Sequence, residues 1–296
     1  MALSGKHFES AGRYPGNHDV NISRFADVRA FLDRAEDWLL LREAENNVLL
    51  GAAKRLLRDD HPYGNPIYFA TVEANDGISG CAWRTPPLKL GLTRLPLASI
   101  PLLVHDVADV YTDLSAVLGP EMEATEFARL WTREHGCKWT IGTRQRILAL
   151  ERVICPATRI YGLLRKARNT DLALAAEWGA GFARDVGIKD FDPLPYSEHL
   201  IRDGCLYFWD DGAFRSMAAA VGPTPNGTRV GYVFTPPPFR NRGYATATVA
   251  SLSQLLLDHG QRFCCLYTDL ANPVSNSIYK RIGYRPVADV VDVNFC

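Results

Sequence analysis

Residues 235–257, TPPPFRNRGYATATVASLSQLLL, constrain the fold more than any other stretch of this chain. The three prolines can neither continue a helix nor join a central strand, so they end the element before them. Gly243 then permits a tight bend of the backbone. After the glycine, apolar residues recur at helical spacing, at Ala245, Val249, Leu252 and Leu256. The stretch therefore predicts a loop that leads directly into the N-terminus of a helix.

Such a helix start is a natural binding place for phosphate, because its first N–H groups are unpaired and lie at the positive end of the helix dipole. Arg240 and Arg242 flank it, although most surface arginines are merely solvated. We call residues 240–246 the cradle. Two other phosphate loops are excluded, because the chain has neither GxxxxGK[ST] nor GxGxxG followed by an acidic residue.

The whole chain has the composition of an ordinary globular protein. Its 296 residues are 47% hydrophobic, enough for one large domain or two smaller ones. The 33 basic residues equal the 33 acidic ones, so we expect no nucleic-acid partner. The most apolar stretch, residues 95–104, is broken by two prolines and too short to span a bilayer, so we expect no membrane partner.

The seven cysteines do not form a recognisable framework. No CxxC pair occurs, the count is odd, and nothing has the spacing of a disulfide or zinc site. Reduced thiols in the cytoplasm are the plain interpretation, and no metal site is expected.

The second half of the chain predicts one α/β unit. A proline and a glycine within residues 154–162 suggest a division into residues 1–155 and 156–296. After the division we expect a strand, a helix ended by Gly187, a three-stranded antiparallel meander, the cradle with its helix, and a strand over residues 263–269. A short helix ended by Gly283 and a last strand follow, so one parallel crossover sits in an otherwise antiparallel sheet.

The first half repeats this outline loosely. We expect helix over residues 28–57, a hairpin, a helix near residues 100–111, a short strand over 116–119, a helix over 121–135 and a strand from residue 139. Pro86 and Pro87 precede LKLGLTRL, which lacks arginine, glycine and alanine at the cradle spacing. We interpret this half as having kept the fold and lost the phosphate site; two unrelated α/β units are the alternative.

The cradle reads Arg240, two residues, Gly243, one residue, Ala245, and here the chain resembles the GNAT superfamily of acyl-CoA-dependent N-acyltransferases. The pattern alone is permissive, but it follows a strand, opens a helix and is trailed by residues 266–287, which resemble the family's second cofactor segment. The resemblance covers the second half, and the arrangement resembles tandem-GNAT proteins. It implies two α/β (α+β) domains, each with a mixed, mostly antiparallel sheet flanked by helices.

The resemblance also implies acetyl-CoA as the acyl donor. The expected contacts to its phosphates come from the cradle, namely Arg240, Asn241, Arg242, Gly243, Tyr244, Ala245 and Thr246. The strand before the cradle is expected to separate from the next strand, so that the pantetheine arm pairs with the backbone of Val233, Phe234 and Thr235. Asn272 and Asn276 are the expected amide contacts, although Asn276 would also suit a helix N-cap.

Acetyl transfer requires a neutral amine, a stabilised oxyanion and a proton for the leaving thiolate. The resemblance makes the Val233 N–H the oxyanion donor and Tyr279 the general acid; Tyr279 as a core residue is the alternative. A phenol with a pKa of about 10 can usefully protonate a thiolate whose thiol has a pKa of about 8.5. Asp269 and Glu177 are the options for the base, and either one could instead be structural.

The acceptor is expected to be a primary amine, which the sequence does not identify further. Four aromatic residues could line its groove, although aromatics at this spacing are more often core: Trp178, Phe182, Trp209 and Phe214. The predicted function is direct acetyl transfer in a ternary complex, because no serine or cysteine nucleophile motif occurs. A non-catalytic acyl-CoA-binding or interaction module is the alternative. A homodimer is one way to cover exposed sheet edges.

Overall fold

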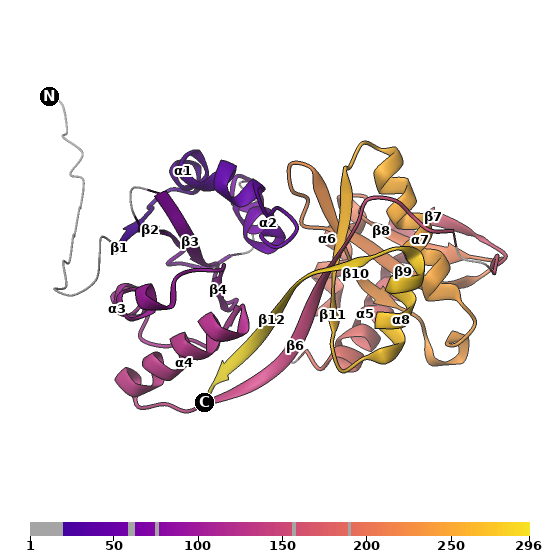
Figure 1. Cartoon of the computed structure of the whole chain (residues 1–296). Coiled ribbons are helices and arrows are strands. Elements are labelled where there is room, and N and C mark those ends of the chain that lie inside the picture. The colour runs from indigo at the N-terminus through magenta and orange to yellow at the C-terminus, as the bar shows by residue number, and fades with distance from the viewer. Residues whose placement is uncertain (1–19, 59–62, 75–76, 156–157, 189–190) are drawn as a thin grey trace, which may run out of the picture. The chain divides into compact units, whose positions relative to one another are not determined.

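The computed structural model describes residues 20–58, 63–74, 77–155, 158–188 and 191–296 (Figure 1). The hairpin turn expected at Asn75 and Asp76 lies outside these residues, as does Pro156 at the predicted division. Contacts along the chain define two compact units. The first comprises Met1–Ala35, Tyr63–Ile141 and Asp292–Cys296, and the second comprises Glu36–Pro62 and Gly142–Val291.

The compact units therefore differ from a simple cut of the chain at residue 155. Glu36–Pro62 belongs to the second unit although it precedes the predicted division. The link is polar: the Glu43 carboxylate accepts hydrogen bonds from the backbone N–H of Asn226 (2.7 Å) and from its side chain (2.8 Å). The division into residues 1–155 and 156–296 stays a prediction about how the sequence is organised.

The first unit contains a mixed sheet with helices. Its elements are β1 Val20–Arg24, most of α1 Val28–Leu40, β2 Tyr68–Ala74, β3 Gly77–Arg84, β4 Leu90–Leu92, the 3-10 turn η1 Leu97–Ser99, α3 Ile100–Ala108, β5 Ala116–Gly119 and α4 Glu121–His135. Its strands lie in the order β1-β2-β3-β4-β5, and only β4 and β5 pair in parallel.

The second unit holds the remaining elements. They are α2 Asn47–Leu56, β6 Trp139–Leu150, β7 Leu163–Lys166, η2 Asn169–Asp171, α5 Leu172–Val186, α6 Pro193–Arg202, β8 Leu206–Asp210, β9 Phe214–Val221, β10 Gly227–Phe234, η3 Pro237–Phe239, α7 Tyr244–Asp258, β11 Phe263–Asp269, α8 Pro273–Ile282 and β12 Arg285–Phe295, with the first residues of β6 and the last of β12 in the first unit. The strand order is β12-β6-β11-β10-β9-β8-β7.

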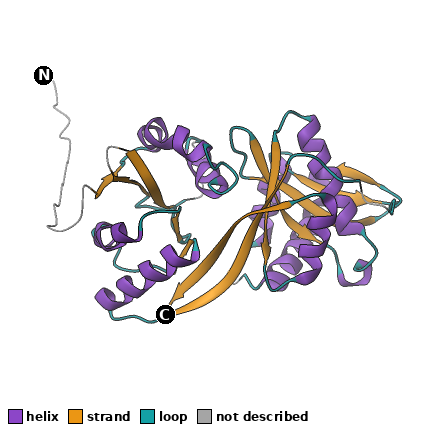
Figure 2. Ribbon diagram, in the orientation of Figure 1, coloured by secondary structure: helices purple, strands orange, loops and turns teal. Residues whose placement is uncertain are grey.

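The two units repeat one topology. Along each half of the chain, two helices follow the first strand, a meander of three strands comes next, and a helix then leads to a strand that pairs in parallel with the last meander strand. The second helix of the first half, α2, belongs to the second compact unit. The predicted fold class, with mixed and mostly antiparallel sheets flanked by helices, is confirmed (Figure 2). The repeat favours two related units over two unrelated ones.

Two apolar cores lie on opposite faces of the sheet in the second unit. One, which we call the α7/α8 core, includes Val249 and Leu252 of α7 and Ile282 of α8. The other, the α5/α6 core, includes Trp178 of α5 and Leu200 of α6. None of the described helices is both long and apolar enough to cross a membrane.

Candidate functional site

A bulge interrupts β10 just before the cradle. The pairing of β10 with β9 shifts between Gly231 and Phe234, so that β10 has one more residue than β9 in this interval. Tyr232 there adopts a left-handed conformation, with φ of 54°. Because the extra residue of a bulge is left out of the ladder, the backbone near Tyr232 and Val233 is only partly used by β9.

The bulge also changes which face of the sheet each side chain reaches. In a regular strand, Val230, Tyr232 and Phe234 would share one face. Here Val230 lies in the α7/α8 core, whereas Tyr232 and Phe234 lie in the α5/α6 core, and Val233 packs against the α7/α8 core. After the extra residue, each side chain at the end of β10 therefore points to the face opposite the one that it would reach in a regular strand.

The parallel pairing of β10 with β11 is short. It covers Gly227–Phe263, Thr228–Cys264 and Arg229–Cys265. Beyond these pairs, β10 continues along β9 to Phe234, and β11 continues along β6 to Asp269. The ladder between the two strands thus ends before the bulge, as the separation expected from the sequence requires.

The cradle is an exposed, left-handed turn. Asn241 and Gly243 have φ angles of 60° and 83°, and α7 begins at the next residue, Tyr244. Residues 240–243 are all exposed, and the first i to i−4 bond of the helix joins the Ala247 N–H to the Gly243 carbonyl. Left-handed residues in a turn direct successive N–H groups toward one concave side, which is an anion-binding geometry.

Gly243 is required at its position for two reasons. Its φ of 83° is a conformation that residues with a Cβ rarely adopt. A Cβ built there would also lie 2.9 Å from Cδ1 of Ile160. The glycine that the sequence pattern singled out is therefore fixed by backbone conformation and by packing.

The two cradle arginines differ in their surroundings. The Arg240 guanidinium donates to the Asp185 carboxylate at the end of α5 (2.5 Å) and to the Thr235 carbonyl (2.9 Å), and it lies 5.7 Å from the Phe234 ring centroid. Arg242 is exposed on the cradle. Arg240 thus braces the turn against α5, which the sequence did not indicate, whereas Arg242 faces solvent.

Phe234 and Thr235, at the end of β10 and before η3, have protein partners. The Phe234 carbonyl accepts a hydrogen bond from the buried Ser216 hydroxyl (3.1 Å), and the Thr235 hydroxyl donates to the same Ser216 oxygen (2.9 Å). Ser216 thus fixes the end of β10 after the bulge. The hairpin pattern placed Ser216 on a strand but gave no signal for this role.

Tyr279 on α8 is a buried tyrosine whose hydroxyl has no hydrogen-bond partner among the described residues. Its side chain lies in the α7/α8 core, and its ring packs edge-on against Tyr284 at 6.0 Å. Burial raises the pKa of Tyr279 to about 12, so the ordinary phenol pKa assumed from the sequence needs correction. The Tyr284 hydroxyl, in contrast, forms a hydrogen bond with the Ser253 hydroxyl (2.8 Å).

The two candidate asparagines lie at the start of α8. Asn272 is the N-cap, and its side-chain oxygen accepts from the Ser275 N–H (3.1 Å). The Asn276 amide donates to the carbonyl of Asp269 (3.0 Å). The idea that Asn276 caps the helix is wrong, because α8 begins one turn earlier, at Pro273.

The candidate bases lie on different elements. Asp269 ends β11, and one of its carboxylate oxygens accepts from the Ala271 N–H (2.8 Å). Glu177 is exposed on α5, whose buried face carries Ala175, Trp178 and Gly179. Asp269 is therefore the candidate at the end of a central strand, and its second carboxylate oxygen has no hydrogen-bond partner among the described residues.

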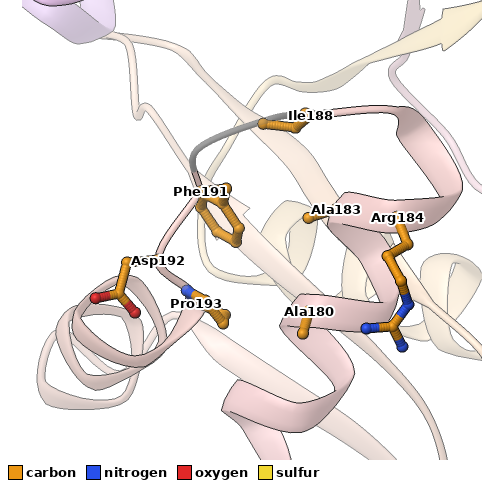
Figure 3. Close-up of a pocket in the computed structure, with 7 residues that line it drawn as sticks. All are labelled: Ala180, Ala183, Arg184, Ile188, Phe191, Asp192 and Pro193. Atoms are coloured by element: carbon orange, nitrogen blue, oxygen red, sulfur yellow. The ribbon is translucent and has the colours of Figure 1, made fainter.

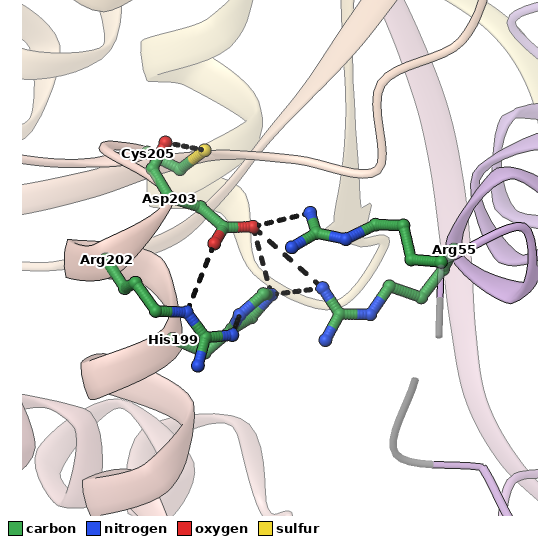
Figure 4. A network of polar contacts seen from close by, with 6 residues as sticks. Arg55, His199, Arg202, Asp203 and Cys205 are labelled. Atoms are coloured by element: carbon green, nitrogen blue, oxygen red, sulfur yellow. Dashed lines mark hydrogen bonds and ion pairs between the residues drawn. The ribbon is translucent and has the colours of Figure 1, made fainter. Parts of the chain in front are cut away.

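His199 belongs to a polar network rather than to the cradle (Figure 4). Its ring nitrogens lie 2.7 Å from the Arg55 guanidinium and 3.0 Å from that of Arg202, and Asp203 lies 3.6 Å away. Arg58 donates to the same Asp203 carboxylate at 2.9 Å. This network joins the end of α2 to the end of α6 within the second unit.

The aromatic residues considered for the acceptor groove are mostly core. Trp178 and Trp209 are each 6% exposed, and Phe214 stacks on the buried Phe208. Phe182 packs edge-on against Tyr232 at 5.1 Å. Trp178, Phe182 and Phe214 thus belong to or pack against the α5/α6 core, as the alternative interpretation held. Trp209 is buried outside that core, and its indole N–H donates to the Tyr161 carbonyl (3.1 Å).

A hollow opens instead between the end of α5 and the start of α6 (Figure 3). Its volume is about 510 Å³, and it is lined by five apolar residues and two charged ones: Ala180, Ala183, Arg184, Ile188, Phe191, Asp192 and Pro193. The Phe191 ring contacts the ring of Tyr232, the left-handed residue of the bulge, at 6.2 Å. The hollow therefore borders the side-chain packing of the bulge on the α5/α6 face.

Sequence reasoning did not find the bulge, although one local signal existed. Gly231 interrupts the strand pattern RVGYVFT, and an isolated glycine within a strand often marks a bulge. The contact between Arg240 and Asp185 had no such signal, because the two residues lie on separate elements.

Comparison with known proteins identifies a family over part of the chain. Residues 211–291, which contain the bulge, the cradle and Tyr279, match the family described as FR47-like protein, which is GNAT-related. None of the curated proteins compared with the chain matches it.

Solved structures share the fold at low sequence identity. A Drosophila protein has a TM-score of 0.70 at 13% identity, covering 93% of this chain and 98% of its own. A GCN5-related N-acetyltransferase from Sphaerobacter thermophilus has a TM-score of 0.58 at 17% identity, covering 93% and 95%. A tandem GNAT protein from the clavulanic acid biosynthesis pathway has a TM-score of 0.52 at 10% identity, covering 94% and 98%.

At these identities the structural likeness establishes the fold, and the family match adds sequence evidence for the segment that carries the cradle. The resemblance noted from the sequence is confirmed by both. This chain therefore has the fold of GNAT proteins, and its residues 211–291 match the GNAT-related FR47-like family.

Proposed function

We propose that the second unit binds acetyl-CoA and transfers its acetyl group to a primary amine. The observation that carries the proposal is the exposed left-handed turn at Asn241 and Gly243, which opens α7 directly after the bulged strand β10. Its N–H groups and the positive end of the helix dipole favour a pyrophosphate, with Arg242 adding charge. Three proteins with this fold or family are described as N-acetyltransferase or GNAT proteins, which supports the same chemistry.

The pantetheine arm is proposed to lie where the ladder between β10 and β11 ends. There the backbone of Val233, Phe234 and Thr235 follows the bulge, and the Val233 N–H is the proposed donor to the thioester oxygen. Such a donor stabilises the negative charge that develops on this oxygen as the amine attacks. Asn272 and Asn276 stay proposed amide contacts at the start of α8.

In the proposed reaction the amine nitrogen forms a bond to the acetyl carbon, and the carbon–sulfur bond breaks. The amine must first be neutral, so one proton leaves it, with Asp269 the proposed acceptor directly or through water. The thiolate leaves as a thiol once it receives a proton, for which Tyr279 is the proposed donor, and the second proton that the amine nitrogen loses as the amide forms restores the Tyr279 phenol. The products are an N-acetylated amine and CoA.

The raised pKa of Tyr279 defines its proposed role more narrowly. With a pKa of about 12 the phenol stays protonated at neutral pH and can donate a hydrogen bond to the departing sulfur. Complete transfer to a free thiolate would be uphill by about 3.5 pKa units, or about 5 kcal/mol. Tyr279 therefore acts mainly by stabilising the sulfur as the bond breaks, and the proton moves fully only late in the reaction.

Two tyrosines on the same side of the sheet give a test with a matched control. Wild-type protein is titrated with acetyl-CoA by calorimetry and then assayed for thiol release with a panel of amines. We expect Tyr279→Phe to lower kcat by about 100-fold without changing the KM for acetyl-CoA. Tyr284→Phe should leave kcat unchanged and destabilise the fold by about 1 kcal/mol, because it removes the partner of the Ser253 hydroxyl.

Two results would count against the proposal. If wild-type protein does not bind acetyl-CoA, the cradle has lost its ligand. If it binds acetyl-CoA but acetylates none of the amines, a non-catalytic acyl-CoA-binding module becomes the better description. The proposed location is the cytoplasm, since all seven cysteines are free thiols, which suits a reducing compartment.

A further inference from the structure

The carboxylate of Asp211 lies outside the cradle and contacts Tyr244 within it. Asp211 lies in the turn between β8 and β9, and its side chain is only 12% exposed. One of its oxygens accepts from the Tyr244 hydroxyl (2.8 Å), and the other accepts from Nε of Arg215 (2.7 Å). Tyr244 is the first residue of α7, so Asp211 is joined directly to one end of the turn.

The other end of the turn is reached through Arg215. Its guanidinium lies 4.6 Å above the ring of Phe239, the last residue of η3. The Phe239 ring in turn packs edge-on against the Tyr244 ring, with centroids 6.5 Å apart. Asp211, Arg215, Phe239 and Tyr244 thus form a closed ring of contacts around the base of residues 240–243.

The protonation states agree with this arrangement. The hydrogen bond to Asp211 raises the pKa of Tyr244, so the phenol keeps its proton and acts as the donor. Desolvation alone would raise the pKa of Asp211, but the bonds from Tyr244 and Arg215 outweigh it and the pKa is lowered. The carboxylate is therefore ionised at neutral pH and accepts from both partners.

We infer that Asp211 is a positioning residue for the cradle, which holds Phe239 and Tyr244 so that the N–H groups between them converge on the phosphates. The inference rests on the proposed function for its ligand, CoA. The segment that it holds contains two left-handed residues and is exposed; its other contacts include Ile160 beside Gly243 and the exposed ion pair between Arg240 and Asp185. A turn fixed before the ligand arrives loses less conformational entropy on binding.

The test compares Asp211→Asn, Tyr244→Phe and the double variant with wild type. Calorimetry gives the affinity for CoA and for S-acetylpantetheine, a probe that lacks the phosphates. We expect Asp211→Asn to weaken CoA binding about fivefold and to leave S-acetylpantetheine binding and kcat at saturating acetyl-CoA unchanged. Because Asp211 acts partly through Tyr244, the effects of the two substitutions on affinity should be less than additive in the double variant.

A second readout needs no ligand. Hydrogen exchange of the amides of residues 241–246 should become faster in Asp211→Asn, while exchange in the last turn of α7 stays the same. The matched control is Asp258→Asn, which removes a carboxylate that accepts from Gln254 (2.7 Å) at the other end of the same helix. This control should change neither cradle exchange nor CoA affinity.

The outcomes separate the inference from the proposed function. If wild type binds no CoA, the proposed function fails, and unchanged cradle exchange in Asp211→Asn would then also reject the positioning role. If wild type binds CoA, the inference is overturned by a folded Asp211→Asn with wild-type affinity and exchange. It is equally overturned if CoA and S-acetylpantetheine lose affinity by the same factor.

Discussion

The turn that opens α7 and its counterpart in the first unit share a topology but present their backbones differently. In both units a 3-10 turn leads from the last meander strand into a helix, as η1 before α3 and η3 before α7. Before α7 the turn is exposed and holds two left-handed residues. Before α3, Ser99 and Ile100 are fully buried, and no described residue from 93 to 100 is left-handed.

A proline in α3 adds a second difference between the two helix starts. Pro101 occupies the first turn of α3 and lacks the N–H that Ala245 supplies at the equivalent second position of α7. The start of α3 therefore offers fewer free N–H donors than the start of α7, and its first residue, Ile100, is fully buried. On the proposed function, anion binding therefore depends on exposure and backbone conformation at the helix start, within a topology that both halves of the chain share.

The comparison also corrects an interpretation made from the sequence. Pro86 and Pro87 were aligned with the prolines before the cradle, but they lie between β3 and β4. The equivalent turn is residues 93–99, which contains Pro96 and follows β4. The prediction that the first half lacks a cradle therefore concerns residues 93–99 and not the residues after Pro86 and Pro87.

The largest expected effect comes from giving the second turn a side chain at its left-handed glycine. Gly243→Asp adds a Cβ 2.9 Å from Ile160 and a negative charge where phosphate is proposed to bind. We expect CoA affinity to fall by at least about 100-fold, since backbone strain, steric overlap and charge repulsion all act in one direction. Calorimetric titration with acetyl-CoA measures the loss.

Gly260→Asp is the matched control for this change. Gly260 follows α7, has φ of 94°, and has no atom within 4 Å of the position that a Cβ would take. It therefore reports the cost of left-handed strain without the cradle or Ile160. Equal affinities in the two variants would mean that the turn is not the phosphate seat.

A proline at position 245 would make the start of α7 resemble the start of α3. Ala245→Pro places proline at the position that Pro101 holds in α3, where a helix tolerates it. One N–H is lost from the cradle, and since a hydrogen bond to a charged group contributes about 1.5–3 kcal/mol, we expect CoA to bind at least about tenfold more weakly. Ala245→Ser keeps the N–H and should bind CoA as wild type does; unchanged affinity in Ala245→Pro would remove this N–H from the site.

The parts of this site that could be predicted are the local ones. The run of prolines, Gly243 and the apolar spacing placed the cradle and the start of α7, and β11 matches the predicted residues 263–269. These features follow from neighbours in sequence. The helix α6 was not predicted, although Asp192 before Pro193 is a regular N-cap signal and its side chain does accept from the Leu194 N–H.

The rest could not be read from the chain, because it depends on elements that meet only in the fold. The carboxylates of Asp211 and Asp185 reach the cradle from the β8–β9 turn and from α5, and no spacing within the sequence indicates either contact. The pKa of Tyr279 rises because α7, α8 and the sheet bury it together. The family resemblance pointed to Tyr279 but gave no information on the pKa of its phenol in the fold.

A smaller effect is expected from the ion pair that braces the cradle. Asp185→Ala releases the Arg240 guanidinium, and both side chains are about half exposed, so stability should change by no more than about 1 kcal/mol. We expect CoA to bind about two- to threefold more tightly, because Arg240 gains freedom to approach the phosphates. Weaker binding would show instead that the pair holds the turn in place. Asp289→Ala, which breaks the exposed pair with Arg146 on β6 and β12, should leave affinity unchanged.

The smallest expected effect is a difference between the two units in how their stability depends on pH. Burial, with the nearby Arg55 guanidinium, lowers the pKa of His199 in the second unit, so the folded state binds this proton less readily than the unfolded chain. The stability that neutral His199 contributes is therefore lost as pH falls through the unfolded value of about 6.5. In the first unit, burial raises the pKa of Asp106, whose contribution is instead lost as pH rises from about 3.9 through the folded value. Acidification from pH 7.5 to 5.5 should thus weaken only the second unit through these groups.

We expect calorimetry to show a Tm lower by about 1–2 °C at pH 5.5, a shift that His199→Gln should abolish. A shift that persists in His199→Gln would assign the acid sensitivity to other groups.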